Sequence, residues 1–185
     1  LEKNTEGQTN IAFGFSVLQN NTTGDANTAI GNRSMETNTT TGGHTAVGYQ
    51  ALRDNNAGSS NTGVGYQVLA YNISGSTNVA TGHTAMRTNT SGSYNTATGY
   101  RALYSNTTAS KNTAHGYKSL YNNTTGGNNT AFGYNAMAST DNATNQTIIG
   151  YEATGQADNS VVLGNDDVTA VYMGEDSGAK VYAGE

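Results

Sequence analysis

A short segment of the form Asn-Thr-Ala-x-Gly, followed in most copies by an aromatic residue, recurs every 17 residues along this chain. No insertion or deletion interrupts the series. The glycines of the copies are Gly14, Gly31, Gly48, Gly65, Gly82, Gly99, Gly116, Gly133 and Gly150. A fixed short period predicts that each unit stacks on the next, so we expect an elongated array and not a globule around one core.

The composition is consistent with such an array. Hydrophobic residues make up 34% of the chain, charged residues 11%, and Pro, Cys and Trp are absent. The apolar residues are spread evenly over the repeats, so a single large core is not expected. Abundant Asn, Thr, Gly and Ser would otherwise indicate disorder, but disordered sequence has no need to keep a register. The absence of cysteine excludes disulfides, metal thiolates and thiol catalysis.

Aligning the repeats on their glycines places equivalent residues in columns. The segment Thr-Ala-x-Gly-Tyr predicts a strand of about five residues, with Thr, x and Tyr on one face and Ala and Gly on the other. The Asn-Thr-Thr-Gly segments, such as residues 21–24, predict turns, because Asn and Gly tolerate left-handed backbone and Asn and Thr cap turns. A helix is disfavoured by the spacing and by the residue types.

We therefore predict an all-β fold, a parallel β-solenoid or β-roll. Nine coils of 17 residues, each with two short strands, occupy residues 1–150, and successive coils rise by roughly 4.8 Å. Beyond residue 150 the glycine spacing changes to 14 and then 10, at Gly164, Gly174 and Gly184. Residues 151–185 are predicted to form a short, β-prism-like, trimeric C-terminal segment.

Each coil has few large apolar residues, which predicts further burial against other chains. We expect the Leu/Met column, four residues after the glycine, and the x column, just before it, to fill the coil. The strip of Ala and Gly would then form the seam of an intertwined or side-by-side homotrimer. The alternative is that these small residues fill a narrow interior.

The repeat resembles a known one. Residues 129–137, Asn-Thr-Ala-Phe-Gly-Tyr-Asn-Ala-Met, are similar to shaft repeats of phage tail fibres and related surface fibres. More distantly, the repeat resembles that of trimeric autotransporter adhesin heads, which are β-rolls with a shorter period. Residues 160–169, Ser-Val-Val-Leu-Gly-Asn-Asp-Asp-Val-Thr, look like the stretch that precedes a self-cleaving intramolecular chaperone in phage fibres. Because the chain begins at Leu1 without a leader, we expect it to be a fragment of a longer protein.

The resemblance implies a structural and adhesive role on a virion surface or elsewhere outside the cell. The expected partners are two further copies of the chain and a host-surface glycan or protein receptor. A bacterial adhesin head is the alternative, and an ice-binding solenoid or a polysaccharide-degrading spike are further alternatives. The Thr column favours ice binding, but only one rank is regular; its residues are Thr28, Thr45, Thr62, Thr96, Thr113, Thr130 and Thr147.

The charged residues and the residue types of the chain exclude several classes of function. The net charge is −5, and residues 55–140 contain no Asp or Glu and four cations, Arg87, Arg101, Lys111 and Lys118, too few for a nucleic-acid footprint. No catalytic, cofactor or metal constellation is predicted, so an enzyme is not expected. The three histidines occupy different columns, and no apolar run is long enough to insert into a membrane.

Two further columns carry chemistry. The tyrosines after the glycines could contact sugar rings; the candidates are Tyr49, Tyr66, Tyr100, Tyr117 and Tyr134. The alternative is that they stack on one another, and Asn32 and His83 are expected to interrupt the column. Six asparagines at the turns begin glycosylation sequons, but we expect them instead to form a ladder in which each amide bonds the next coil's backbone; they are Asn21, Asn38, Asn72, Asn89, Asn106 and Asn123.

Overall fold

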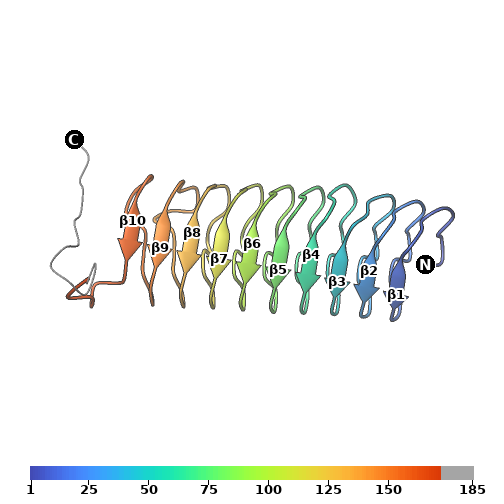
Figure 1. Cartoon of the computed structure of the whole chain (residues 1–185), viewed down its shortest axis with the longest axis horizontal. Helices are drawn as coiled ribbons and strands as arrows, with labels where there is room; N and C mark the ends of the chain where they lie inside the picture. Colours follow the sequence, from blue (N-terminus) through green and yellow to red (C-terminus); the bar gives the residue numbers. More distant parts are fainter. Residues whose placement is uncertain (172–185) are drawn as a thin grey trace, which may run out of the picture.

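A computed structural model describes residues 1–171 as one β-solenoid. Ten strands of three residues each lie side by side in chain order and form a single parallel sheet along the rod (Figure 1). The strands are β1 (Ile11–Phe13), β2 (Thr28–Ile30), β3 (Thr45–Val47), β4 (Thr62–Val64), β5 (Val79–Thr81), β6 (Thr96–Thr98), β7 (Thr113–His115), β8 (Thr130–Phe132), β9 (Thr147–Ile149) and β10 (Val161–Leu163).

The strand register follows the sequence period. From β1 to β9 each residue pairs with the one 17 positions later, as Ala29 does with Ala46. At the end the offset falls to 14, so that Val161 pairs with Thr147. The first residues beyond 150 thus add a tenth strand to the same sheet. The remainder of the predicted C-terminal segment, including Gly174 and Gly184, lies outside the described residues.

The prediction of two strands per coil is wrong, because the described coils have one strand each. The rest of the coil turns repeatedly through left-handed backbone. In the third coil, for example, Gln50, Leu52 and Ser60 have φ angles of 54°, 50° and 56°. Residues with positive φ cannot continue an extended strand, so the coil closes through turns. Backbone hydrogen bonds still join adjacent coils there, as between the Leu52 N–H and the Val68 carbonyl at 3.0 Å.

The Ala column lies inside the coil, which corrects the predicted alanine-lined seam. Ala29, Ala46, Ala80 and Ala97 are buried with the Leu/Met column, whereas the x residues, including Phe13, point outward. A coil of 17 residues is too narrow for large side chains on both inner walls, so a methyl group faces each Leu or Met. The prediction was correct for the Leu/Met column and wrong for the x column.

Two exceptions show how tightly the interior is filled. At Gly63, a Cβ atom would lie 3.1 Å from Val68 Cγ1 and 3.5 Å from Leu52 Cγ. Val68 therefore takes the volume that an alanine takes in the preceding strand. In the last coil of the repeat region, the buried Ile148 replaces alanine, and the exposed Thr154 stands at the Leu/Met position. Volume is thus conserved across the coil in both cases.

The turn asparagines form a buried ladder, as predicted, but the bonds between coils join side chains and not, as expected, an amide and the next coil's backbone. The Asn89 amide donates to Asn72 Oδ1 at 2.5 Å in the preceding coil and to the Gly92 carbonyl at 2.9 Å. The Asn106 amide in turn donates to Asn89 Oδ1 at 2.6 Å. The six sequon asparagines are all buried, so their side chains are inaccessible to glycosylation in the folded chain.

A second asparagine ladder precedes the strands. Each side-chain oxygen accepts the backbone N–H of the equivalent residue in the next coil, as Asn78 Oδ1 accepts the Asn95 N–H at 3.0 Å. The same side chain donates to the Gly92 carbonyl at 2.8 Å. Polar groups that would be unsatisfied inside the coil are thereby bonded, which stabilises the side of the coil that has no large apolar residues.

Candidate functional site

The residue after each repeat glycine projects from the turn that follows the strand. The glycines have φ between 117° and 146°, a region open to glycine and closed to other residues. The backbone at each glycine places the residue that follows it on the outside of the rod. The equivalent residues of successive coils therefore lie one coil apart. The five candidate tyrosines, Tyr49, Tyr66, Tyr100, Tyr117 and Tyr134, consequently lie in one column.

These rings stack into one ladder. Adjacent ring centroids along the column are 4.8–5.3 Å apart, with interplanar angles of 6–21°. His83 is part of the ladder, at 4.9 Å from Tyr66 and 5.3 Å from Tyr100, so the predicted interruption there is wrong. A planar imidazole preserves the stack because it presents the same flat face. Tyr151 extends the ladder at the C-terminal end.

Stacking determines what the ladder can bind. Tyr100 and Tyr117 are 37% and 38% exposed, and the exposed parts are ring edges and hydroxyls, because the ring faces cover one another. Within the ladder, a sugar therefore cannot stack against a ring face. At its end Tyr151 is 60% exposed, and a hydrogen bond to Glu152, together with that charge, raises the pKa of its phenol.

A row of cations lies beside the ladder, which the sequence prediction missed. The Arg101 guanidinium is 5.2 Å from the Tyr100 ring centroid and 5.4 Å from that of Tyr104. One coil later, Lys118 Nζ is 5.4 Å from Tyr117 and 5.6 Å from Tyr121.

The outer rings of this arrangement also stack, with the centroids of Tyr104 and Tyr121 5.3 Å apart. Each cation therefore lies between two phenol rings. The sequence carried a signal for it, since the two tyrosines share one repeat position and the two cations share another.

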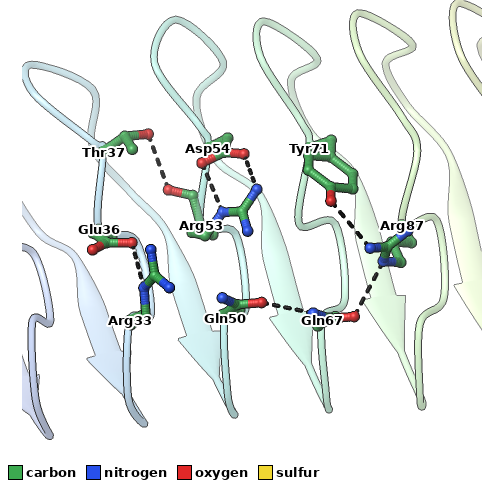
Figure 2. A network of polar contacts seen from close by, with 9 residues as sticks. All are labelled: Arg33, Glu36, Thr37, Gln50, Arg53, Asp54, Gln67, Tyr71 and Arg87. Atoms are coloured by element: carbon green, nitrogen blue, oxygen red, sulfur yellow. Dashed lines mark hydrogen bonds and ion pairs between the residues drawn. The ribbon is translucent and has the colours of Figure 1, made fainter.

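In neighbouring coils the arginine side chains form hydrogen bonds or ion pairs with other side chains (Figure 2). Arg87 donates to Gln67 Oε1 at 3.2 Å and to the Tyr71 hydroxyl at 3.1 Å. Arg53 Nε donates to Asp54 Oδ1 at 2.8 Å, and this bond, with the carboxylate charge, raises the pKa of Arg53. All three nitrogens of Arg87 and two of Arg53 donate hydrogen bonds, whereas among the described residues no side-chain hydrogen bond is formed by Arg101 or Lys118.

The three histidines have unrelated environments. His44 is buried in the second asparagine ladder, where burial lowers its pKa to about 4. His83 is in the tyrosine ladder, and His115 stacks on Phe132 with centroids 4.6 Å apart. Across residues 1–171, no three His, Cys, Asp or Glu side chains gather in a way that could hold a metal ion.

The C-terminal end of the described coils holds a hollow of about 500 Å³, lined by Glu152, Asp166 and Asp167 among others. These carboxylates lie beyond residues 55–140, which contain no Asp or Glu.

Comparisons with known proteins add no relative. No family model matches the chain, and neither the curated proteins nor the solved structures contain a match. Within residues 1–171 there is no helix long and apolar enough to cross a membrane.

Proposed function

We propose that this chain is a structural and adhesive segment of a homotrimeric surface fibre, carried by a virion or by a bacterium. Three copies would pack side by side through the outward faces of their ten-stranded sheets. The tyrosine and cation columns would remain on the outside and contribute to host attachment. The observation that supports this proposal is the chemistry of the outward sheet face.

The outward face of the sheet has two ranks of side chains and no Asp, Glu, Lys or Arg. The first rank consists of Ile11, Thr28, Thr45, Thr62, Val79, Thr96, Thr113, Thr130, Thr147 and Val161. The second consists of Phe13, Ile30, Val47, Val64, Thr81, Thr98, His115, Phe132, Ile149 and Leu163. Phe13 is 75% exposed and Phe132 is 54% exposed. Half of these side chains are apolar and the others are Thr or His, so the face is an uncharged, partly apolar strip that suits contact with another chain.

A second and third copy fit this face for a geometric reason. Every copy repeats its side chains at the same coil rise, so identical ranks can stay in register along the full length of the rod. Long cyclic interfaces of this kind favour parallel, in-register association. The charged residues of the central coils, such as Arg87 and Lys118, lie off this face, so association leaves them in solvent.

Light scattering coupled to gel filtration tests the assembly. We expect a trimer for the native chain, and a monomer for Val64→Lys, which puts a charge at the centre of the second rank. Ile73→Lys is the matched control, because Ile73 is 50% exposed but lies in a turn away from the sheet. A native chain that is folded and monomeric, as judged by circular dichroism, would contradict the proposal.

Ice binding is a second candidate, favoured by the rank of threonines on a straight parallel sheet. The second rank argues against it, because Phe13, His115 and Phe132 interrupt a flat surface. Thermal hysteresis of the native chain separates the two functions: a fibre segment gives none, and an ice-binding solenoid gives a freezing-point gap that Thr96→Tyr and Thr113→Tyr reduce.

A further inference from the structure

We infer that the row formed by Arg101 and Lys118, between the two tyrosine stacks, binds an anionic polysaccharide bearing carboxylate or sulfate groups. The inference deepens the proposed attachment function, on which its biological meaning rests. The row is defined by these two cations and by the four rings that flank them, Tyr100, Tyr104, Tyr117 and Tyr121.

The arrangement of a cation between two rings repeats from one coil to the next. In two successive coils a cation lies between an inner and an outer ring, at 5.2 and 5.4 Å for Arg101 and at 5.4 and 5.6 Å for Lys118. The rings themselves stack between coils at 5.1 and 5.3 Å. The cations are therefore held at a spacing of one coil rise along the rod. A polymer with regularly placed anionic groups suits such a row better than a single small anion.

Apart from the rings, these two cations have no side-chain partner in the described part of the chain. Among the described residues, no hydrogen bond uses the Arg101 guanidinium or the Lys118 ammonium, and neither forms an ion pair. Arg101 Nε is buried, but the two terminal guanidinium nitrogens of Arg101 and Lys118 Nζ are not among the buried atoms, so these are the donors that an anion can reach. By contrast, Arg87 in the preceding coil donates to Gln67, Tyr71 and Tyr104. Charge-assisted hydrogen bonds to an oxyanion would satisfy donors that the chain itself leaves open.

The coils around the two cations carry no negative side chains. Residues 55–140 contain no Asp or Glu, so no carboxylate on these coils competes with an incoming anion. The cations therefore create a local positive potential on a chain whose net charge is −5. The exposed tyrosine edges beside them carry hydroxyl groups, which suit the hydroxyls of a sugar chain.

A glycan fits this row better than a nucleic acid does. Single-stranded nucleic acids are bound largely by stacking of bases on free aromatic faces. Here both faces of Tyr100 and of Tyr117 are covered, because His83 and Tyr134 continue the stack beyond them, and Tyr104 and Tyr121 cover one face of each other at an interplanar angle of 11°. What the row offers is positive charge and hydroxyl edges.

Calorimetric titration of the whole chain tests the inference, with heparin as the polyanionic probe, dextran as the uncharged one and a single-stranded DNA of similar charge. We expect heparin to bind with an affinity that falls as salt rises, and dextran not to bind. Arg101→Gln and Lys118→Gln should each weaken heparin binding roughly tenfold, the loss of one charge-assisted contact.

Lys111→Gln is the matched control. Lys111 is exposed and carries the same charge, but it precedes β7, whereas Lys118 follows it, and no ring flanks it. We expect this variant to bind heparin within about twofold of the native chain, because it removes only diffuse charge. An equal loss in Lys111→Gln, no binding of heparin, or tighter binding of the DNA would overturn the inference.

The two proposals fail separately. A trimer that does not bind heparin leaves the proposed assembly standing and removes this inference. A monomer whose heparin binding depends on Arg101 and Lys118 does the reverse. Melting temperatures of each variant, measured by circular dichroism, show whether a loss of binding reflects a loss of fold.

Discussion

Nδ1 of His44 accepts the backbone N–H of Asn61 at 3.1 Å, the role that an asparagine side-chain oxygen plays in most other coils. The neutral ring then carries its proton on Nε2, which lies 3.2 Å from the Thr41 hydroxyl. The substitution also breaks the neighbouring ladder, since the Asn55 amide turns to Thr41 at 3.2 Å instead of to Asn38. His44 is thus the one titratable side chain in a ladder otherwise built, over the described coils, of amides.

This contact predicts that the chain loses stability in mild acid. The folded pKa of His44 is about 4, below its ordinary value of 6.5, because burial disfavours the charged ring. Between these pH values the unfolded chain binds more protons, so the free energy of unfolding falls as the pH drops from 6.5 to 4. The loss approaches roughly 3 kcal/mol and levels off below pH 4. Urea unfolding at a series of pH values measures it.

His44→Asn is the control for this prediction. It restores the residue of the repeat, so the fall in stability over this pH range should largely disappear. An unchanged pH dependence in the variant would show that carboxylates, and not His44, are responsible.

The packing of Gly63 against Val68 predicts strong coupling between the two positions. Gly63→Ala overfills the coil by about 1–3 kcal/mol, because the added Cβ would lie 3.1 Å from Val68 Cγ1. Val68→Ala alone leaves a cavity and costs about 2–3 kcal/mol. The double variant recreates the alanine pair found at Ala46 and Ala51, so we expect it to be close to the native chain. A double-mutant cycle from chemical unfolding checks this, and simple additivity would refute it.

The repeat glycines are predicted to tolerate no side chain. Gly82 has φ of 135°, and a Cβ there would overlap the carbonyl oxygen of Gly99 in the next coil. We expect Gly82→Ala to cost roughly 4 kcal/mol or more. Gly43→Asn should stay within about 0.5 kcal/mol of the native chain, because a Cβ there would make only ordinary contacts with Ser60, the nearest at 3.4 Å, and equivalent positions hold Ala26 and Ser60 at positive φ. Comparable losses in the two variants would contradict the assignment.

The buried asparagine ladder predicts a large effect of removing one amide. Asn89→Ala leaves the buried Asn72 Oδ1 without its donor and removes one of the two hydrogen bonds of the Gly92 carbonyl and of the Asn106 amide, which should cost roughly 2–4 kcal/mol. The exposed Asn122 provides the comparison, and Asn122→Ala should change stability by less than about 0.5 kcal/mol. Thermal unfolding of both variants measures the difference, and an equal effect would show that the ladder contributes no specific stability.

The period of the sequence was sufficient to predict the coil, its length and the parallel register, because stacking repeats admits few alternatives. It was also sufficient for the turn asparagines, whose residue type matches left-handed and capped backbone. It did not predict the inward face of the strand, since both faces carry apolar columns. Hydrophobicity favoured Val47 and Phe132 for the interior, but the width of the coil admits only alanine there.

The candidate site was predicted in part. The tyrosine column was found, and the alternative that its rings stack on one another is what the structure shows. His83 was expected to interrupt the tyrosine ladder because it is not a tyrosine. Its imidazole is also a flat ring, so it stacks in the same way. Arg101 and Lys118 were judged by number of charges alone, and their placement between rings depends on side-chain directions that a column alignment does not provide.

The hydrogen bonds that join residues 17 apart give the molecule a modular length. Every coil from β1 to β9 offers its neighbours the same backbone partners and nearly the same cross-section. Duplicating or deleting one repeat in the gene would lengthen or shorten the rod by a single step of roughly 4.8 Å and leave the other coils unchanged. The length of the rod can therefore change by recombination between repeats while the fold stays the same.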